Sequence, residues 1–311
     1  MKKLSLRTFI QNLYSLWVYD YHMTDLEARF RLDVLEKWGK LQKQLSYYNG
    51  ELSNSPEIQF IKNAVSPQMN LYPYKKIKDL SSIDVQYDST LKMPYVLHEG
   101  KRLYYPKSYT CEKCESSYRF VIAYDQILGG GYLEKAPHCY QTSAFKVEEG
   151  DVLVDCGAAE GLFSLDVIDR VSHAFLIEAD AVWLPALQAT FAPYKDKVTI
   201  IPKYLSDKDD KHNVTLATLL ANHTESCFIK MDIEGAEKQV VKCSMDFLKS
   251  RENVRLVCCT YHYQHDAEEL SELFEAIGYK YTFSDGYLLF ALYDNLEPPY
   301  LRHVLIRAQK Q

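Results

Sequence analysis

From Val147 onward, short apolar segments alternate with segments of helical pattern, and this alternation constrains the fold more than any other feature of the sequence. The apolar segments have the length of buried strands, and the strands of a parallel sheet covered on both faces read as continuous runs of Val, Ile and Leu. They are residues 152–155, 174–178, 198–201, 227–231 and 254–259. Strand-rich sequence also follows Gly278. The pattern predicts an α/β fold in which helices cover both faces of a parallel sheet.

Ligands of such sheets bind beyond the carboxyl ends of the strands, so the residues that follow each strand are informative. The first predicted strand runs into Asp155-Cys156-Gly157-Ala158-Ala159-Glu160-Gly161. Gly157 allows a ligand to approach the backbone closely, and Gly161 allows the next helix to start close to the strand. The second predicted strand ends at Glu178, whose carboxylate is suited to accept both hydroxyls of a ribose.

The first turn lacks the three glycines, spaced G-x-G-x-x-G, that bring a dinucleotide pyrophosphate onto a helix N-terminus. The acidic Glu160 at the start of the helix also disfavours a pyrophosphate. S-adenosylmethionine has no phosphate and carries a sulfonium cation and an amino group, so it suits this turn better. An NAD-dependent oxidoreductase is the alternative enzyme class. A catalytically inactive cofactor-binding domain that serves as an assembly partner is the non-catalytic alternative.

Two segments of the chain resemble the FkbM family of S-adenosylmethionine-dependent methyltransferases. They are residues 150–161 and the segment Phe228-Ile229-Lys230-Met231-Asp232-Ile233-Glu234-Gly235-Ala236-Glu237, which is similar to the family signature K-x-D-I-E-G-A-E. Ala136-Pro137-His138-Cys139-Tyr140 and Tyr261-His262 add to the resemblance, which covers roughly residues 120–290. It implies a class I fold, a Rossmann-like seven-stranded sheet whose last strand is antiparallel. It also implies methyl transfer to an oxygen of a sugar or a natural product.

The fourth predicted strand places charged residues where the cofactor is expected. Lys230, Asp232 and Glu234 alternate with apolar residues, so we expect the three side chains on one side of the chain. Asp232 is the best candidate to face the transferred methyl group, and Lys230 is a second catalytic candidate. Asp232 and Glu234 together would suit Mg²⁺. Because neither carboxylate has a clear third ligand in the sequence, a metal-free site is favoured.

Methyl transfer to a hydroxyl group needs a base that removes the proton. His262, directly after the fifth predicted strand, is the first candidate, because an imidazole titrates near neutral pH. His138 and Asp232 are the alternatives. The candidate cofactor-binding residues are Asp155, Gly157, Ala158, Ala159, Gly161, Glu178, Ser206, Asp207 and Asp232.

Three regions are expected along the chain. Apolar residues at spacings of three and four predict a mainly helical region over residues 1–75, which would pack on the rest of the chain or on a second copy in a homo-oligomer. Residues 76–148 are expected to connect this region to the catalytic domain and to cap the substrate. They include a predicted hairpin of residues 95–98 and 102–105. Residues 149–311 form the predicted methyltransferase domain.

The charge and hydropathy of the chain restrict its surroundings. The formal net charge of −6 argues against a nucleic-acid partner, so a small hydroxylated acceptor is expected. No apolar run reaches the length of a membrane span, and Arg7, Gln11 and Asn12 interrupt the apolar stretch that a signal peptide needs. We therefore expect a cytoplasmic protein whose eight cysteines are reduced.

Overall fold

The computed structural model describes residues 39–63, 83–130, 136–288, 298 and 300–310. The chain forms two compact units, one of residues 1–73 and 289–301 and the other of residues 74–288 and 302–311. The region expected to cap the substrate therefore shares one unit with the sheet domain, rather than standing apart from it. Residues 300 and 301, which the prediction assigns to the methyltransferase domain, belong to the N-terminal unit.

In the smaller unit, residues 39–47 form a helix and α3 (Pro56–Asn63) forms another. Their buried apolar residues are Leu41, Leu45, Ile58 and Ile61. Such spacing gives each helix one apolar face. Tyr48 contacts Tyr300 edge to face, with ring centroids 5.4 Å apart, which explains why residues near position 300 belong to this unit. Residues 1–38, with most of the predicted helical pair, lie outside the described residues, so the contact with a second copy stays a prediction.

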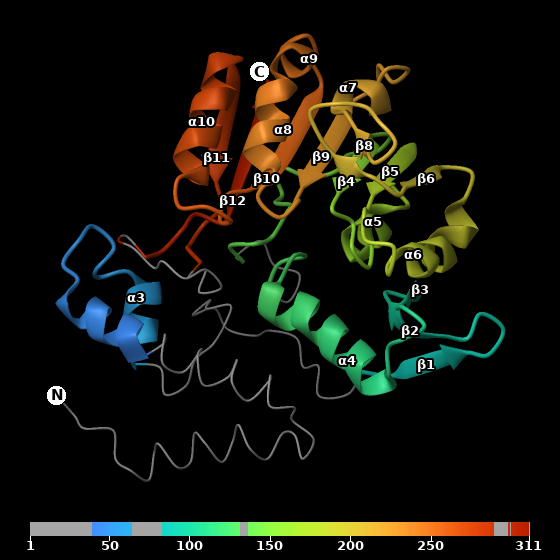
Figure 1. Ribbon diagram of the computed structural model, residues 1–311, viewed down its shortest axis with the longest axis horizontal. Coiled ribbons are helices and arrows are strands. Elements are labelled where there is room, and N and C mark those ends of the chain that lie inside the picture. Colours follow the sequence, from blue (N-terminus) through green and yellow to red (C-terminus); the bar gives the residue numbers. More distant parts are fainter. Residues whose placement is uncertain (1–38, 64–82, 131–135, 289–297, 299, 311) are drawn as a thin grey trace. The chain divides into compact units, whose positions relative to one another are not determined.

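The larger unit contains a seven-stranded sheet of order β11-β12-β10-β9-β4-β5-β6 (Figure 1). Its strands are β4 (Val152–Cys156), β5 (His173–Ile177), β6 (Val198–Ile201), β9 (Cys227–Met231), β10 (Val254–Cys259), β11 (Tyr279–Phe283) and β12 (Leu305–Lys310). The strands from β6 to β10 in this order are parallel, and β12 pairs antiparallel with both β10 and β11. The predicted α/β fold, with a Rossmann-like seven-stranded sheet and an antiparallel last strand, is confirmed.

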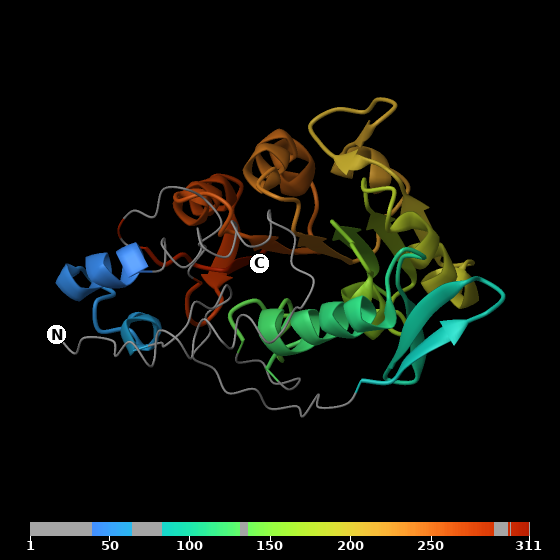
Figure 2. The same ribbon diagram turned by 60° about the horizontal axis from the view of Figure 1, so that its bottom comes forward.

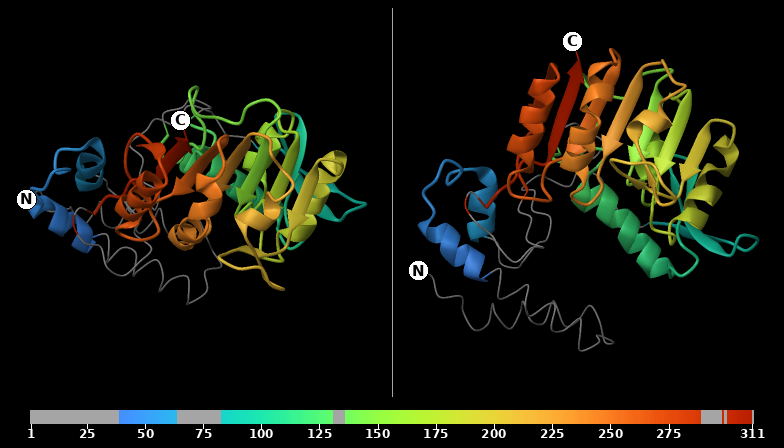
Figure 3. Two further views of the ribbon diagram at one scale, coloured as in Figure 1. Left: turned by 90° about the horizontal axis from the view of Figure 1, so that it is seen from above. Right: turned by 45° about the horizontal axis from the view of Figure 1, so that its top comes forward.

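Helices cover both faces of this sheet. One face packs against α7 (Leu216–Leu219), α8 (Glu237–Cys243), α9 (Met245–Lys249) and α10 (Asp266–Ala276). Figure 3 shows α8 and α10 lying side by side on this face. On the other face, α5 (Leu162–Val167) places the Phe163 ring 6.0 Å from the Phe228 ring. Among the described residues, no helix is long and apolar enough to cross a membrane.

A small antiparallel sheet precedes the large one and consists of β1 (Val85–Asp88), β2 (Met93–His98) and β3 (Lys101–Tyr104). The predicted hairpin is confirmed, with Glu99 and Gly100 at positive φ in its turn. It packs on α6 (Leu184–Phe191), where Ala186 lies against its tyrosines. α4 (Cys111–Arg119) and a π-helical segment, Phe120–Asp125, follow. α4 lies beyond the carboxyl ends of the central parallel strands (Figure 2).

Candidate functional site

The turn after β4 directs its backbone donors toward β5. The N–H groups of Gly157 and Ala158 both donate to the Ile177 carbonyl, at 2.9 and 3.1 Å. The N–H of Ala159 donates to Glu178 Oε2 at 2.8 Å. Three successive donors are therefore used inside the protein, whereas a dinucleotide-binding turn offers its amides to a pyrophosphate.

The two glycines of this turn are needed for protein packing. A Cβ at Gly157 (φ +76°) would lie 1.9 Å from the Asp232 carbonyl oxygen, so the neighbouring strand β9, not a ligand, approaches the backbone here. A Cβ at Gly161 (φ +81°) would lie 2.8 Å from side-chain atoms of both Leu187 and Phe191 on α6. The predicted close approaches exist, but their partners are β9 and α6.

Glu178 lies at the end of β5 with its carboxylate held in place by two backbone donors. Besides Ala159, the N–H of Asp180 donates to its Oε1 at 2.7 Å. The side chain is half-buried. Ser206 and Asp207 follow β7 (Tyr204–Leu205), and Asp207 accepts hydrogen bonds from Ser206 and from Gln239 on α8. These bonds, with that from Gln239 first, lower the pKa of Asp207.

Asp155 and Lys230 form a buried ion pair between β4 and β9, with Lys230 Nζ 3.1 Å from Asp155 Oδ1. The Ser164 hydroxyl donates to the other oxygen of Asp155 at 2.6 Å. Lys230 also donates to the carbonyl of Gly157 at 2.6 Å, so it braces the turn. Burial disfavours the ammonium, but the charges of Asp155 and Asp232 outweigh it and raise the pKa of Lys230. Both side chains are thus occupied within the protein.

Asp232 follows β9 and lies at the centre of the polar cluster. Tyr140 donates to its Oδ2 at 3.0 Å and Tyr261 to its Oδ1 at 3.3 Å. The Nε2 atoms of His138 and His262 lie 3.7 Å from Oδ2 and 3.8 Å from Oδ1. The Asp232 side chain is 21% exposed, whereas those of the two histidines are 3% and 2% exposed. Asp232 is therefore the member of this group most accessible to a ligand.

The charges around Asp232 fix its ionisation state. Burial alone would raise its pKa, but Lys230, the two histidines and the bond from Tyr140 outweigh burial and lower the pKa to about 2. At neutral pH the side chain is a carboxylate and a weak base. Its chemistry is to accept hydrogen bonds and to stabilise positive charge.

The two histidines differ in their environments. His138 Nδ1 lies 2.7 Å from Asp125 Oδ1, and although burial opposes a charged ring, Asp125 outweighs burial and raises the pKa of His138. Burial dominates at His262 and lowers its pKa, despite the attraction of Asp232 and Glu234. Near neutral pH, His262 is the neutral ring and therefore the better candidate base.

Glu234 and Glu237 diverge after β9. The strand ends at Met231 and Glu234 has φ +57°, so the expected alternation stops before it and its side chain is 90% exposed. Glu237 is buried, and its Oε1 accepts the N–H of Ile233 at 2.7 Å and lies 3.4 Å from His262 Nδ1. Burial raises the pKa of Glu237 to about 8.

Two groups of potential metal ligands meet at Asp232 within the described residues. One group is Asp232, Glu237 and His262, and the other is His138, Asp232 and Cys259, with the ligand atoms of each group within 4.8 Å of one another. The Glu234 carboxylate is 90% exposed and lies 3.7 Å from His262 Nε2. It joins neither group, so the Asp232–Glu234 pair considered for Mg²⁺ is not one of them.

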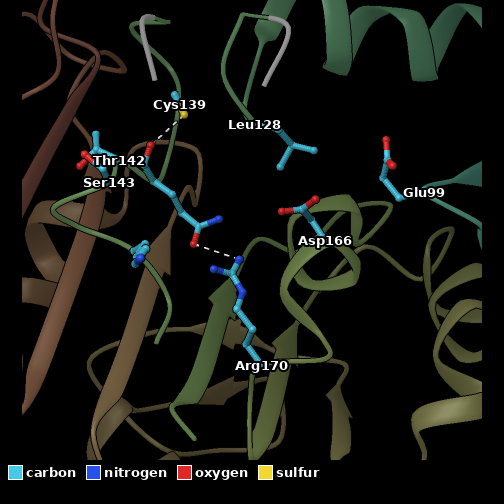
Figure 4. Close-up of a pocket in the computed structure, with 9 residues that line it drawn as sticks. Glu99, Leu128, Cys139, Thr142, Ser143, Asp166 and Arg170 are labelled. Atoms are coloured by element: carbon cyan, nitrogen blue, oxygen red, sulfur yellow. Dashed lines mark hydrogen bonds between the residues drawn. The ribbon is translucent and has the colours of Figure 1, made fainter. Parts of the chain in front are cut away.

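A cavity of about 470 Å³ lies apart from this cluster (Figure 4). It is lined by Glu99, Leu128, Cys139, Gln141, Thr142, Ser143, Lys146, Asp166 and Arg170. Arg170 donates to the Gln141 side chain at 3.4 Å across it. None of the predicted site residues lines this cavity, although its wall begins next to His138.

The predicted residues His138, Asp232 and His262 meet in one cluster, and Lys230 and Asp155 lie directly behind it. The prediction missed Tyr140, Tyr261 and Asp125. Both tyrosines stand within two positions of a predicted histidine, in His-x-Tyr and Tyr-His segments, so a signal was present. No sequence pattern marks Asp125.

Comparisons with known proteins give structural matches alone. No protein-family model matches the chain, and no curated protein matches it. The methyltransferase FkbM from Methylobacillus flagellatus KT matches with 19% identity over 54% of this chain and a TM-score of 0.44. The match covers 46% of that structure, so this chain spans less than half of its length.

Two further structures match at lower identity. A precorrin-6y C5,15-methyltransferase from Geobacter metallireducens GS-15 matches with 15% identity over 54% of this chain and 85% of its own, with a TM-score of 0.38. TYW2 of M. jannaschii, in complex with AdoMet, matches with 14% identity over 70% of this chain and 85% of its own, also with a TM-score of 0.38.

Proposed function

We propose that this protein is an S-adenosylmethionine-dependent methyltransferase. The observation that carries the proposal is the turn after β4, whose three successive N–H groups are bound to β5 while carboxyl groups stand around it. A pyrophosphate would find few donors and would meet negative charge there, which argues against the NAD-dependent alternative. A ligand with a sulfonium and an ammonium group would instead be attracted by the carboxyl groups around this turn.

Three carboxyl groups fit such a ligand. Glu178, held in place by backbone donors, is placed to accept ribose hydroxyls. Glu160 in the turn is half-buried, and burial raises its pKa to about 7, so the cationic end of the ligand beside it would favour the ionised carboxylate. Asp232, whose side chain is 21% exposed, would lie near the reacting methyl group. Ser206 and Asp207 remain candidate contacts to the nucleoside.

We propose an O-methyl transfer in which His262 is the base. The cofactor supplies a methyl group bonded to a positively charged sulfur. Neutral His262 would take the hydroxyl proton of the acceptor, whose oxygen would receive the methyl group, and the cofactor would leave as a neutral thioether. Asp232 orients the acceptor and stabilises the imidazolium formed on His262. Lys230 and Asp155 act as positioning residues, because their charges are satisfied behind the site.

A small hydroxylated acceptor, such as a sugar or a natural product, is the substrate class we propose. A nucleic-acid backbone would bring phosphates toward Glu160, Glu178 and Asp232 on a chain of net charge −6, which electrostatics opposes. A metal-free reaction is favoured, because Glu237 already accepts a backbone hydrogen bond and Glu234 belongs to neither group of potential ligands.

Calorimetry with S-adenosylmethionine, its demethylated product and NAD tests the cofactor class directly. We expect both sulfur compounds to bind and NAD to leave their titrations unchanged. Tight NAD binding without a response to S-adenosylmethionine would overturn the proposal. Cofactor binding without turnover on any sugar or natural-product hydroxyl would favour the catalytically inactive assembly partner instead.

A further inference from the structure

We propose that Asp125, His138 and Tyr140 are positioning residues that clamp one oxygen of the Asp232 carboxylate, with the His138 ring held as a cation between the carboxylates of Asp125 and Asp232. This inference rests on the proposed function, because it assigns His138 a role other than that of the base. The segment before β4 shares one unit with the large sheet. The three residues come from that segment, and the carboxylate they hold comes from the end of β9.

The direction of the hydrogen bonds determines where the protons lie. The Tyr140 hydroxyl has a single hydrogen and donates it to Asp232 Oδ2 at 3.0 Å. In the proposed clamp His138 Nε2, 3.3 Å from the same hydroxyl oxygen and 3.6 Å from Cys259 Sγ, donates to the hydroxyl oxygen. His138 Nδ1 faces an oxygen of Asp125 at 2.7 Å, and an ionised carboxylate only accepts. Hydrogens on both ring nitrogens make His138 an imidazolium.

The groups packed around His138 favour this charge. Asp125 and Asp232 stand on opposite sides of the ring, at 2.7 and 3.7 Å. Lys230 is the positive charge that opposes them, but it is already paired with Asp155. The other titratable neighbours are neutral. They are the Tyr140 and Tyr261 rings, with centroids 5.2 and 5.4 Å from the His138 ring, and Cys259, whose Sγ lies 3.6 Å from Nε2.

The backbone that presents Asp125 is itself unusual. Asp125 ends the π-helical segment that follows α4, and Gln126 after it is left-handed at φ +56°. Single turns of π-helix are rare and occur frequently at functional sites. The turn fixes the Asp125 carboxylate against a ring that is 3% exposed. Through His138 and Tyr140 this holds Asp232 Oδ2, so Oδ1 faces Tyr261 and His262.

The chain contains a matched control for each variant. His98 is buried like His138, with the Tyr118 hydroxyl 2.9 Å from its Nδ1 and Asp166 3.5 Å from its Nε2. This second trio lies outside the Asp232 cluster. Asp166→Asn and Tyr118→Phe therefore reproduce the chemical change of Asp125→Asn and Tyr140→Phe without touching the proposed clamp.

Two-bond proton–nitrogen correlation spectra of the histidine rings test the charge on His138 without any turnover. In the full chain we expect the imidazolium pattern for His138 at neutral pH and a neutral tautomer for His262, each assigned by its Gln variant. Asp125→Asn should lower the titration midpoint of His138, and Asp166→Asn should leave it unchanged. A neutral His138 ring at neutral pH in the unsubstituted protein would overturn the inference, even if the protein methylates its acceptor.

Kinetics test whether the clamp positions Asp232. Tyr140→Phe frees Asp232 Oδ2, and a displacement of about 1 Å in a reacting geometry costs on the order of 100-fold in rate. We expect kcat to fall by about that factor, with an unchanged Kd for S-adenosylmethionine and an unchanged acid limb of the pH profile, because the base is His262. Tyr118→Phe should retain full kcat. An unchanged kcat in folded Tyr140→Phe, or a shifted acid limb, would refute the positioning role.

Discussion

The Nε2 atoms of His138 and His262 face opposite oxygens of a single carboxylate, that of Asp232, at 3.7 and 3.8 Å. Each ring turns its Nδ1 toward another carboxyl group, Asp125 at 2.7 Å and Glu237 at 3.4 Å. The two arrangements look alike, but the pKa of His138 is raised and that of His262 is lowered. The short bond to Asp125 accounts for much of the difference. One carboxylate thus lies between a cation and a base.

The first prediction concerns the charge of Glu160. Glu160→Gln should weaken S-adenosylmethionine by about tenfold, or ~1.4 kcal/mol, and its demethylated product much less, because the product lacks the sulfonium charge. Calorimetry with both ligands measures this ratio. Glu149→Gln, an exposed acid at the other end of β4, is the control and should leave the ratio unchanged.

The same site should respond to pH in the unsubstituted protein. Burial raises the pKa of Glu160 to about 7, so its carboxyl ionises as the pH rises through neutrality. The preference for S-adenosylmethionine over the product should therefore increase from about pH 6 to about pH 8. The Glu160→Gln variant should lose this increase. A pH-independent preference in the unsubstituted protein would argue that Glu160 does not face the sulfonium.

The second prediction separates cofactor binding from turnover. Glu178→Ala removes an acceptor for ribose hydroxyls and should weaken the cofactor by about 1.5–3 kcal/mol, with a smaller effect on saturated turnover. Asp232→Asn is nearly isosteric and should mainly reduce kcat, because it removes charge at the reacting end. Equilibrium titration and single-turnover rates resolve the two effects. Similar losses of cofactor affinity in both variants, with normal turnover, would place Asp232 in the binding site only.

The central strands of the large sheet, and the residues that follow them, were predictable from the sequence. Each central strand is a buried apolar run, and the residues at the strand ends had to meet at one edge of the sheet. Glu234 was predicted to share one side of the chain with Lys230 and Asp232. This prediction failed because the strand ends three residues earlier and the chain turns at positive φ. Gly157 was predicted to allow the close approach of a ligand, whereas the group that approaches it is the Asp232 carbonyl, 75 positions further along the chain. The position of Asp125 depends on a π-helical turn, which no hydrophobic periodicity in the sequence predicts.

The third prediction concerns stability and follows from Glu237. Its pKa is about 8 in the folded protein against an ordinary value of 4.5, so the folded state keeps this proton after the unfolded state has lost it. Stability from this group is therefore lost as the pH rises from about 4.5 to about 8, by up to ~1.4 kcal/mol for each pH unit. Glu237→Gln keeps the acceptor for the Ile233 N–H and removes the titration.

Denaturant unfolding at a series of pH values checks this effect. Relative to the unsubstituted protein, Glu237→Gln should gain stability steadily across that window. Glu272→Gln, at an exposed position of α10, is the control and should give a constant difference. A constant difference for Glu237→Gln as well would mean that the buried carboxyl is already ionised in the folded protein.

The last prediction identifies the base and the role of metal ions in one set of assays. Burial lowers the pKa of His262, so activity should be retained below the ordinary value of 6.5 and should decline only as the ring becomes protonated at lower pH. His262→Ala should lose on the order of 10²–10⁴-fold in kcat, whereas His173→Ala, at the opposite end of β5, should lose nothing. Transfer of labelled methyl groups to a panel of sugars and natural-product hydroxyls provides the measurement. EDTA should leave the activity intact, because the proposed reaction uses His262 as its base and needs no metal ion. If EDTA abolishes turnover and Mg²⁺ or Mn²⁺ restores it, then Asp232, Glu237 and His262, whose ligand atoms lie within 4.8 Å, hold an ion, and the base must be sought elsewhere.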